Sequence, residues 1–281
     1  MIRIVMLMCI ILSLSGCTII NAVIAMNKST DHFISFEQDS RVIYEAGAET
    51  TAKTVADNLA IAIHTIEQKH YRKFTKPVVV HVCSSLESFT AYCIQSRAVG
   101  CVLNQRLFLS PTVKHRTAAV LKHELSHLHM EQQLGMLHWY SGVPAWFQEG
   151  LAVYVSGGGG AEKVTINEAQ QSMVLGVAFT PDTSGSLIFH KSAQSYGLKP
   201  HMFYRQASLF VEYLHVIDET RFRLFLLSLE DGEGFEAAIS SAYGTPLNKL
   251  WQHFILQLKI QSEYRGARSI ASPSFESGPT L

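Results

Sequence analysis

The sequence predicts an α+β protein, with a small β-sheet in the first part of the chain and a helix-rich remainder. Short β-branched segments such as Pro77–Cys83 lie before residue 110. Two segments with helical periodicity follow, and almost everything after Ser156 has the pattern of helix or loop. Strands gathered in one part of a chain and helices in another are typical of this class.

The first elements are predicted in the following order. Two short strands are expected at His32–Glu37 and Arg41–Tyr44, followed by a long helix at Gly47–His70. The apolar side chains of that helix recur at helical spacing: Val55, Leu59, Ile63 and Ile66. A strand at Pro77–Cys83 and a short helix at Ser85–Tyr92 complete this part of the chain.

A hairpin and two helices are predicted next. Gly100–Leu103 and Arg106–Leu109 have the pattern of paired strands around a two-residue turn. The first helix ends at the stop signal Gly135, and Pro144 suits the first turn of the second. Leucines at helical spacing indicate that the first helix is amphipathic: Leu121, Leu125 and Leu128.

The first of these helices carries the motif H-E-x-x-H. Its histidines, His123 and His127, are four residues apart, so both imidazoles lie on one face of the helix. A hydrolytic zinc site needs a third protein ligand and one open position, and Glu149 on the second helix is the candidate. Glu124 points about 100° around the helix from His123, so it is expected to act as a base without binding the metal.

At these four residues the chain resembles the gluzincin class of zinc metallopeptidases. The segment from Pro144 to Ala152 resembles the small peptidase MA members of that class, and the resemblance spans roughly Val42 to Phe254. It implies a zincin-like fold with a small mixed sheet and an active-site helix, Zn²⁺ as cofactor and a peptide or protein substrate. It also implies His123, His127 and Glu149 as metal ligands.

Tyr204 lies in a later segment that also resembles the minimal gluzincins. By that resemblance its hydroxyl can approach the cleft and stabilise a developing oxyanion. The alternative is a core tyrosine on an amphipathic helix. In zincins a strand before the active helix lines the substrate, and Val99–Leu109 is the candidate here; the alternative is an ordinary place in the sheet.

Two positions depart from the resemblance. Thermolysin-like members carry an acid four residues after the ligand Glu, where this chain has Val153, and aminopeptidase-like members often carry one at the position of Ser156. The group that orients a ligand histidine therefore cannot be identified from the sequence. The glycines Gly157–Gly160 are interpreted either as a flexible rim of the cleft or as the stop of the preceding helix.

The N-terminus has the pattern of a targeting segment. Arg3 precedes the apolar stretch Ile4–Leu14, and the residues up to Cys17 resemble a bacterial lipobox. We therefore expect a lipid on Cys17 that anchors the protein in the cell envelope, and Thr18 indicates the outer membrane, facing the periplasm. The alternative is an uncleaved anchor helix.

This interpretation divides the chain into four parts. Residues 1–16 are the signal peptide, 17–31 the lipidated N-terminus and linker, 32–267 the metallopeptidase domain and 268–281 a disordered tail rich in Ser, Pro and Gly.

The remaining cysteines face an oxidising compartment under this interpretation. Cys83 and Cys93 are separated by a predicted helix that holds them too far apart for a bridge. Cys101 is therefore expected to pair with Cys83 or Cys93, or all three are buried thiols.

The composition restricts the partners. The chain has 23 basic and 23 acidic residues and no basic run, which argues against nucleic acid as a partner; the oligomeric state is not indicated. The function expected is a zinc-dependent, lipid-anchored peptidase with Glu124 as general base. The alternatives are an envelope assembly or chaperone-like factor with a zinc site, against which Glu124 argues, and a zinc hydrolase of cell-wall amide bonds.

Overall fold

The structure is a computed structural model that describes residues 24–93, 98–185 and 191–271 of the 281-residue chain. The chain forms two compact units. The first, here called the sheet unit, contains the described residues up to Trp139 together with Val155–Gly160. The second, the helical unit, contains Tyr140–Tyr154 and the residues from Ala161 onwards. Cys17 and the predicted signal segment lie outside the described residues.

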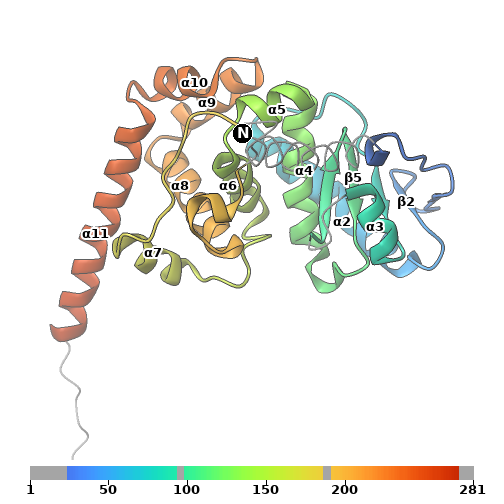
Figure 1. Ribbon diagram of the computed structural model, residues 1–281, viewed down its shortest axis with the longest axis horizontal. Coiled ribbons are helices and arrows are strands. Elements are labelled where there is room, and N and C mark those ends of the chain that lie inside the picture. Colours follow the sequence, from blue (N-terminus) through green and yellow to red (C-terminus); the bar gives the residue numbers. More distant parts are fainter. Residues whose placement is uncertain (1–23, 94–97, 186–190, 272–281) are drawn as a thin grey trace, which may run out of the picture. The chain divides into compact units, whose positions relative to one another are not determined.

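A five-stranded mixed sheet forms the centre of the sheet unit (Figure 1). Its order is β1-β2-β3-β5-β4, with β3 parallel to β2 and β5 and the two outer pairs antiparallel. The strands are β1 (Ile34–Ser35), β2 (Val42–Tyr44), β3 (Val80–Val82), β4 (Gly100–Leu103) and β5 (Arg106–Leu109). The predicted α+β class and the small mixed sheet are confirmed, although β1 is shorter than the predicted strand because only two of its residues pair with β2.

The β4–β5 hairpin has the bounds that the sequence indicated. Its turn residues Asn104 and Gln105 have φ values of 52° and 59°. Two left-handed residues in succession twist the chain in the sense that two antiparallel strands require. The hairpin places β4 at the edge of the sheet, paired only with β5 among the described strands.

Three helices cover the sheet: α2 (Glu49–His70), α3 (Leu86–Cys93) and α4 (Thr117–Leu134). Phe108 of β5 faces α3, where the Tyr92 ring stacks on it with centroids 4.6 Å apart. Helices α2 and α4 pack against each other (Figure 1). From residue 123 to 131 every side chain of α4 is buried except His127, which is half-buried. This middle part of the helix is therefore buried on nearly all sides, because α2, β4 and β5 all pack against α4.

A disulfide joins Cys93, at the end of α3, to Cys101 on β4, with the two Cα atoms 6.0 Å apart. This is one of the two pairings that the sequence left open. Cys83 is a buried free thiol, and burial raises its pKa to about 12. The edge strand is thus attached covalently to the helix beside it.

Part of the predicted linker is held against the sheet unit. The Arg106 guanidinium donates hydrogen bonds to the carbonyl oxygens of Ala25, Met26 and Lys28 at 2.6–2.8 Å. The Tyr92 hydroxyl donates to the Ser29 carbonyl at 2.8 Å. Residues 25–29 therefore belong structurally to the sheet unit.

A short helix, α5 (Met136–Gly142), precedes α6 (Ala145–Ser156) in the chain, so the two predicted helices are not consecutive. The later helices are α7 (Ile166–Val174), α8 (Pro200–Ile217), α9 (Glu219–Glu230), α10 (Phe235–Tyr243) and α11 (Leu247–Ala271). Helix α11 extends past residue 268, where the tail was predicted to begin. None of the helices in the described ranges combines the length and apolar character that a membrane crossing requires.

The helical unit is built around aromatic side chains. The buried Trp146 ring of α6 lies 5.3 Å from Phe210 and 5.8 Å from Phe235, centroid to centroid. Its indole N–H donates to the Asp182 carbonyl at 2.8 Å. On α8, Gln206 donates to the Val177 carbonyl and so holds the loop after α7.

Candidate metal centre

Helix α4 places the two motif histidines side by side. The Nε2 atoms of His123 and His127 are 3.1 Å apart, and the rings are nearly perpendicular at 79°. His123 is 7 % exposed and His127 is half-buried, so the pair lies in a largely buried place. The two imidazoles are therefore held within the fold and are not exposed surface side chains.

The hydrogen bond on the far side of His123 determines its tautomer. Its Nδ1 atom lies 2.9 Å from the carbonyl oxygen of Gly159, and this contact is buried. A carbonyl oxygen can only accept a hydrogen bond, so Nδ1 must carry the proton. The Nε2 atom then keeps its lone pair, which is the form that binds a metal.

The spacing of the two Nε2 atoms fits a shared metal ion. Two histidine nitrogens at ordinary zinc bond lengths and a tetrahedral angle are about 3.3 Å apart. The observed 3.1 Å agrees with this value. The pair therefore presents two nitrogen donors at the separation that a zinc ion requires.

Glu124 lies against the edge strand of the sheet. A Cβ atom added to Gly100 of β4 would come within 2.6 Å of Glu124 Cγ and 2.8 Å of Glu124 Oε1. The Glu124 side chain therefore occupies the space that any other residue at position 100 would fill. It is 7 % exposed, so its carboxylate lies in a place with little access to water.

Glu149 and Tyr204 belong to the helical unit. Glu149 is half-buried on α6, and the next residue, Gly150, lies so close to α8 that an added Cβ would be 2.8 Å from the Ala207 carbonyl oxygen. The glycine after Glu149 is thus required by helix packing. Tyr204 is half-buried on α8 beside Phe203, with ring centroids 5.8 Å apart.

A buried polar layer lies beside the motif, where α4 packs against α2. His70 Nε2 is 3.0 Å from the Ser126 hydroxyl, and the His70 and His129 rings are 4.5 Å apart. Burial lowers the pKa of His70 to about 3, so its ring stays neutral. These groups position α4 within the sheet unit.

Three contacts of the site were not predicted, and all involve glycines: Gly100, Gly150 and Gly159. An isolated glycine in a strand or a helix is a signal of close approach, and both Gly100 and Gly150 carry that signal. The run of four glycines after α6 was noticed in the sequence, but its contact with His123 depends on the tertiary fold.

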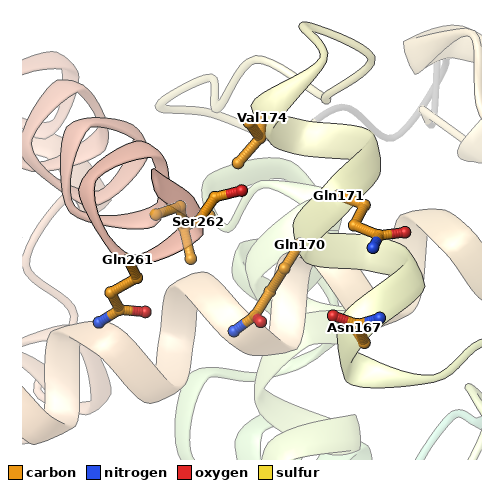
Figure 2. Close-up of a pocket in the computed structure, with 7 residues that line it drawn as sticks. Asn167, Gln170, Gln171, Val174, Gln261 and Ser262 are labelled. Carbon is orange, nitrogen blue, oxygen red and sulfur yellow. The ribbon is translucent and has the colours of Figure 1, made fainter. Parts of the chain in front are cut away.

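A hollow of about 330 Å³ lies between α7 and α11 in the helical unit (Figure 2). Most of its lining side chains are polar and uncharged: Asn167, Gln170, Gln171, Gln261 and Ser262. None of the predicted site residues lines it, and it offers no metal-binding side chain.

Residues 109–257, more than half of the chain, match the family model described as the Peptidase MA superfamily. The match covers α4, α6 and α8, and the α+β architecture agrees with a zincin-like fold. No individual curated protein matches the chain.

Proposed function

The chain belongs to the Peptidase MA superfamily, and from this premise we propose that it is a zinc-dependent peptidase of gluzincin type. The observation that carries the proposal is the pair of facing Nε2 atoms on α4, with Glu124 between His123 and His127 in sequence. His123 and His127 offer two of the three protein ligands that a hydrolytic zinc site needs. We assign Glu149 as the third ligand, which leaves one position open for catalysis.

We assign one role in the proposed reaction to the metal and one to each catalytic side chain. When bound, zinc supplies Lewis acidity, which polarises the peptide carbonyl and favours ionisation of water near neutral pH. Glu124 accepts the proton of the attacking water and delivers it to the leaving nitrogen. The Tyr204 hydroxyl donates a hydrogen bond to the oxygen that develops negative charge.

The substrate is proposed to bind as an extended peptide along β4. An edge strand is the place in a sheet where an added peptide chain can pair through its N–H and C=O groups. Because Gly100 lies on β4 and directly contacts Glu124, a peptide on this strand would have its backbone near the base. This arrangement supports a peptide rather than a small-molecule substrate.

The test compares wild type and Glu124→Gln on a peptide library and on cell-wall fragments, each with and without a chelator. We expect chelator-sensitive peptide hydrolysis that falls by about 10²–10⁴ in Glu124→Gln, with about one zinc per chain retained. Glu131→Gln is the matched control, because Glu131 is buried on the same helix but accepts a hydrogen bond from Gln105 N–H. It should keep full activity.

The outcomes separate the alternatives. Cleavage of cell-wall fragments alone would favour an amide hydrolase of the cell wall. Zinc binding without hydrolysis of either substrate class would favour an envelope assembly factor and would contradict the proposal.

We further propose that a lipid on Cys17 anchors the protein in the bacterial envelope. Fractionation of wild type and Cys17→Ser tests this. Wild type should yield a shortened, acylated chain in the detergent phase, and Cys17→Ser an unprocessed precursor. A wild-type chain that still begins at Met1 would favour the uncleaved anchor instead.

A further inference from the structure

The glycine loop 157–160 comes directly after α6, the helix that carries the proposed ligand Glu149. Gly157, Gly158 and Gly160 have φ values of +73°, +106° and +89°, which side chains rarely adopt. Gly159 is restricted by space, because an added Cβ would lie 2.7 Å from the Ala119 carbonyl oxygen and 2.9 Å from Ser156 Oγ. Every position of the loop therefore has a reason to be glycine.

The backbone N–H and C=O groups of Gly159 are both held by hydrogen bonds. The Gly159 N–H donates to Ser156 Oγ at 3.0 Å, and its carbonyl accepts from His123 Nδ1 at 2.9 Å. Both contacts are buried. The same peptide segment is thus attached to the end of α6 and to the imidazole on α4.

We propose that Gly159 is the positioning residue for His123, and that the glycine loop replaces the acidic side chain that usually orients a metal-binding histidine. The proposal rests on the proposed function only in that His123 is a zinc ligand. The physical reason is that the carbonyl selects the Nδ1–H tautomer and fixes the ring direction before metal binds. A partner of this kind typically contributes about 10–100-fold to metal affinity.

The loop also explains a departure from the resemblance. Ser156 stands where aminopeptidase-like members often carry an acid, and here its hydroxyl accepts from Gly159 N–H. The Ser156 hydroxyl thus fixes the backbone of the loop, and the Gly159 carbonyl of that loop fixes the His123 ring through its own hydrogen bond. A backbone carbonyl carries no formal charge, so the site orients His123 without adding a negative charge beside the metal.

The test is the zinc affinity of the full-length protein, measured by competition with a chelating indicator. Gly159→Ala should weaken zinc binding about 10–100-fold, because the new Cβ displaces the carbonyl from His123. Gly47→Ala is the control, since Gly47 also belongs to the sheet unit and has a φ of +95° but nothing within 4 Å of an added Cβ. It should lower the melting temperature and leave zinc affinity unchanged.

A second measurement does not require a variant to fold. ¹⁵N NMR of the zinc-loaded wild type should show a protonated Nδ1 and a metal-bound Nε2 on His123. The opposite assignment, or wild-type zinc affinity in folded Gly159→Ala, would overturn the proposal. Failure of the proposed function would look different, as zinc binding that depends on Gly159 without any peptide hydrolysis.

Discussion

At the scale of single residues, Glu124 is restrained by a neighbour that has no side chain. Gly100 leaves room for the Glu124 carboxylate, and a Cβ at that position would overlap Glu124 Cγ at 2.6 Å. The three atoms nearest to that added Cβ all belong to Glu124. The position of the proposed base can therefore be changed without altering the metal ligands.

Gly100→Ala should lower peptide hydrolysis by about 10²-fold, because a displacement of about 1 Å in a catalytic group has an effect of that order. Zinc content should stay at the wild-type value. Metal analysis beside kcat and KM provides the check. Unchanged kcat in a folded, zinc-loaded variant would show that Glu124 does not depend on this contact.

Tyr204→Phe tests the proposed donor to the oxyanion. Removal of only the hydroxyl should lower kcat by about 10²–10³ and leave the ring contact with Phe203 in place. Thermal melting should be close to that of wild type. A lower melting temperature with unchanged turnover per folded molecule would instead identify a structural hydrogen bond.

At the scale of elements, the disulfide between Cys93 and Cys101 supports the edge strand. Strand β4 is paired only with β5 among the described strands, whereas α3 packs its buried Phe89 and Tyr92 rings on the sheet unit. The disulfide therefore fixes β4, which pairs only with β5 among the described strands, to a helix that is itself packed on the sheet unit.

Replacement of both cysteines by alanine should lower the free energy of unfolding by about 2–3 kcal/mol, because the bridge closes a loop with a sequence separation of 8. Denaturant titration of oxidised wild type and the double variant measures the difference. Cys83→Ala serves as the comparison, since it removes a buried thiol without opening the bridge. Equal midpoints for wild type and the double variant would contradict this estimate.

Local patterns predicted the elements well and their contacts less well. The β4–β5 hairpin and the end of α4 at Gly135 follow from turn and stop signals within a few residues. The facing histidines follow from helical spacing alone. The partner of Cys101 and the contact between His123 and Gly159 join residues that only the tertiary fold brings together. Helix α5 was missed because seven residues give too short a periodic pattern.

At the scale of the whole molecule, buried neutral histidines link stability to pH. Burial lowers the pKa of His70 from 6.5 to about 3, and burial followed by the charge of Arg106 lowers that of His81 to about 4. Below pH 6.5 the unfolded chain takes up protons that the folded chain does not. The contribution of these neutral histidines to the free energy of unfolding is therefore fully present above pH 6.5, and it decreases as the pH falls towards 4.

Each of these histidines should contribute a slope of up to about 1.4 kcal/mol per pH unit in that range. Denaturant titrations at several pH values, in the presence of a chelator so that metal release does not contribute, measure the slope. His70→Gln should make it shallower, while replacement of the exposed His64 on the same helix should not. Equal slopes for wild type and His70→Gln would contradict the assignment.

The burial of the middle of α4, residues 123–131, has a consequence for how the protein tolerates mutation. Between residues 123 and 131 only His127 is even half-exposed, so no position there faces solvent freely. The motif histidines lie on one face, and Ser126 and His129 lie on a neighbouring face against His70 of α2. Substitutions across this stretch should accordingly be poorly tolerated, whereas the solvent-facing positions of α2 should accept many different residues. In a saturation library selected only for folding, most substitutions at residues 123–131 should be lost.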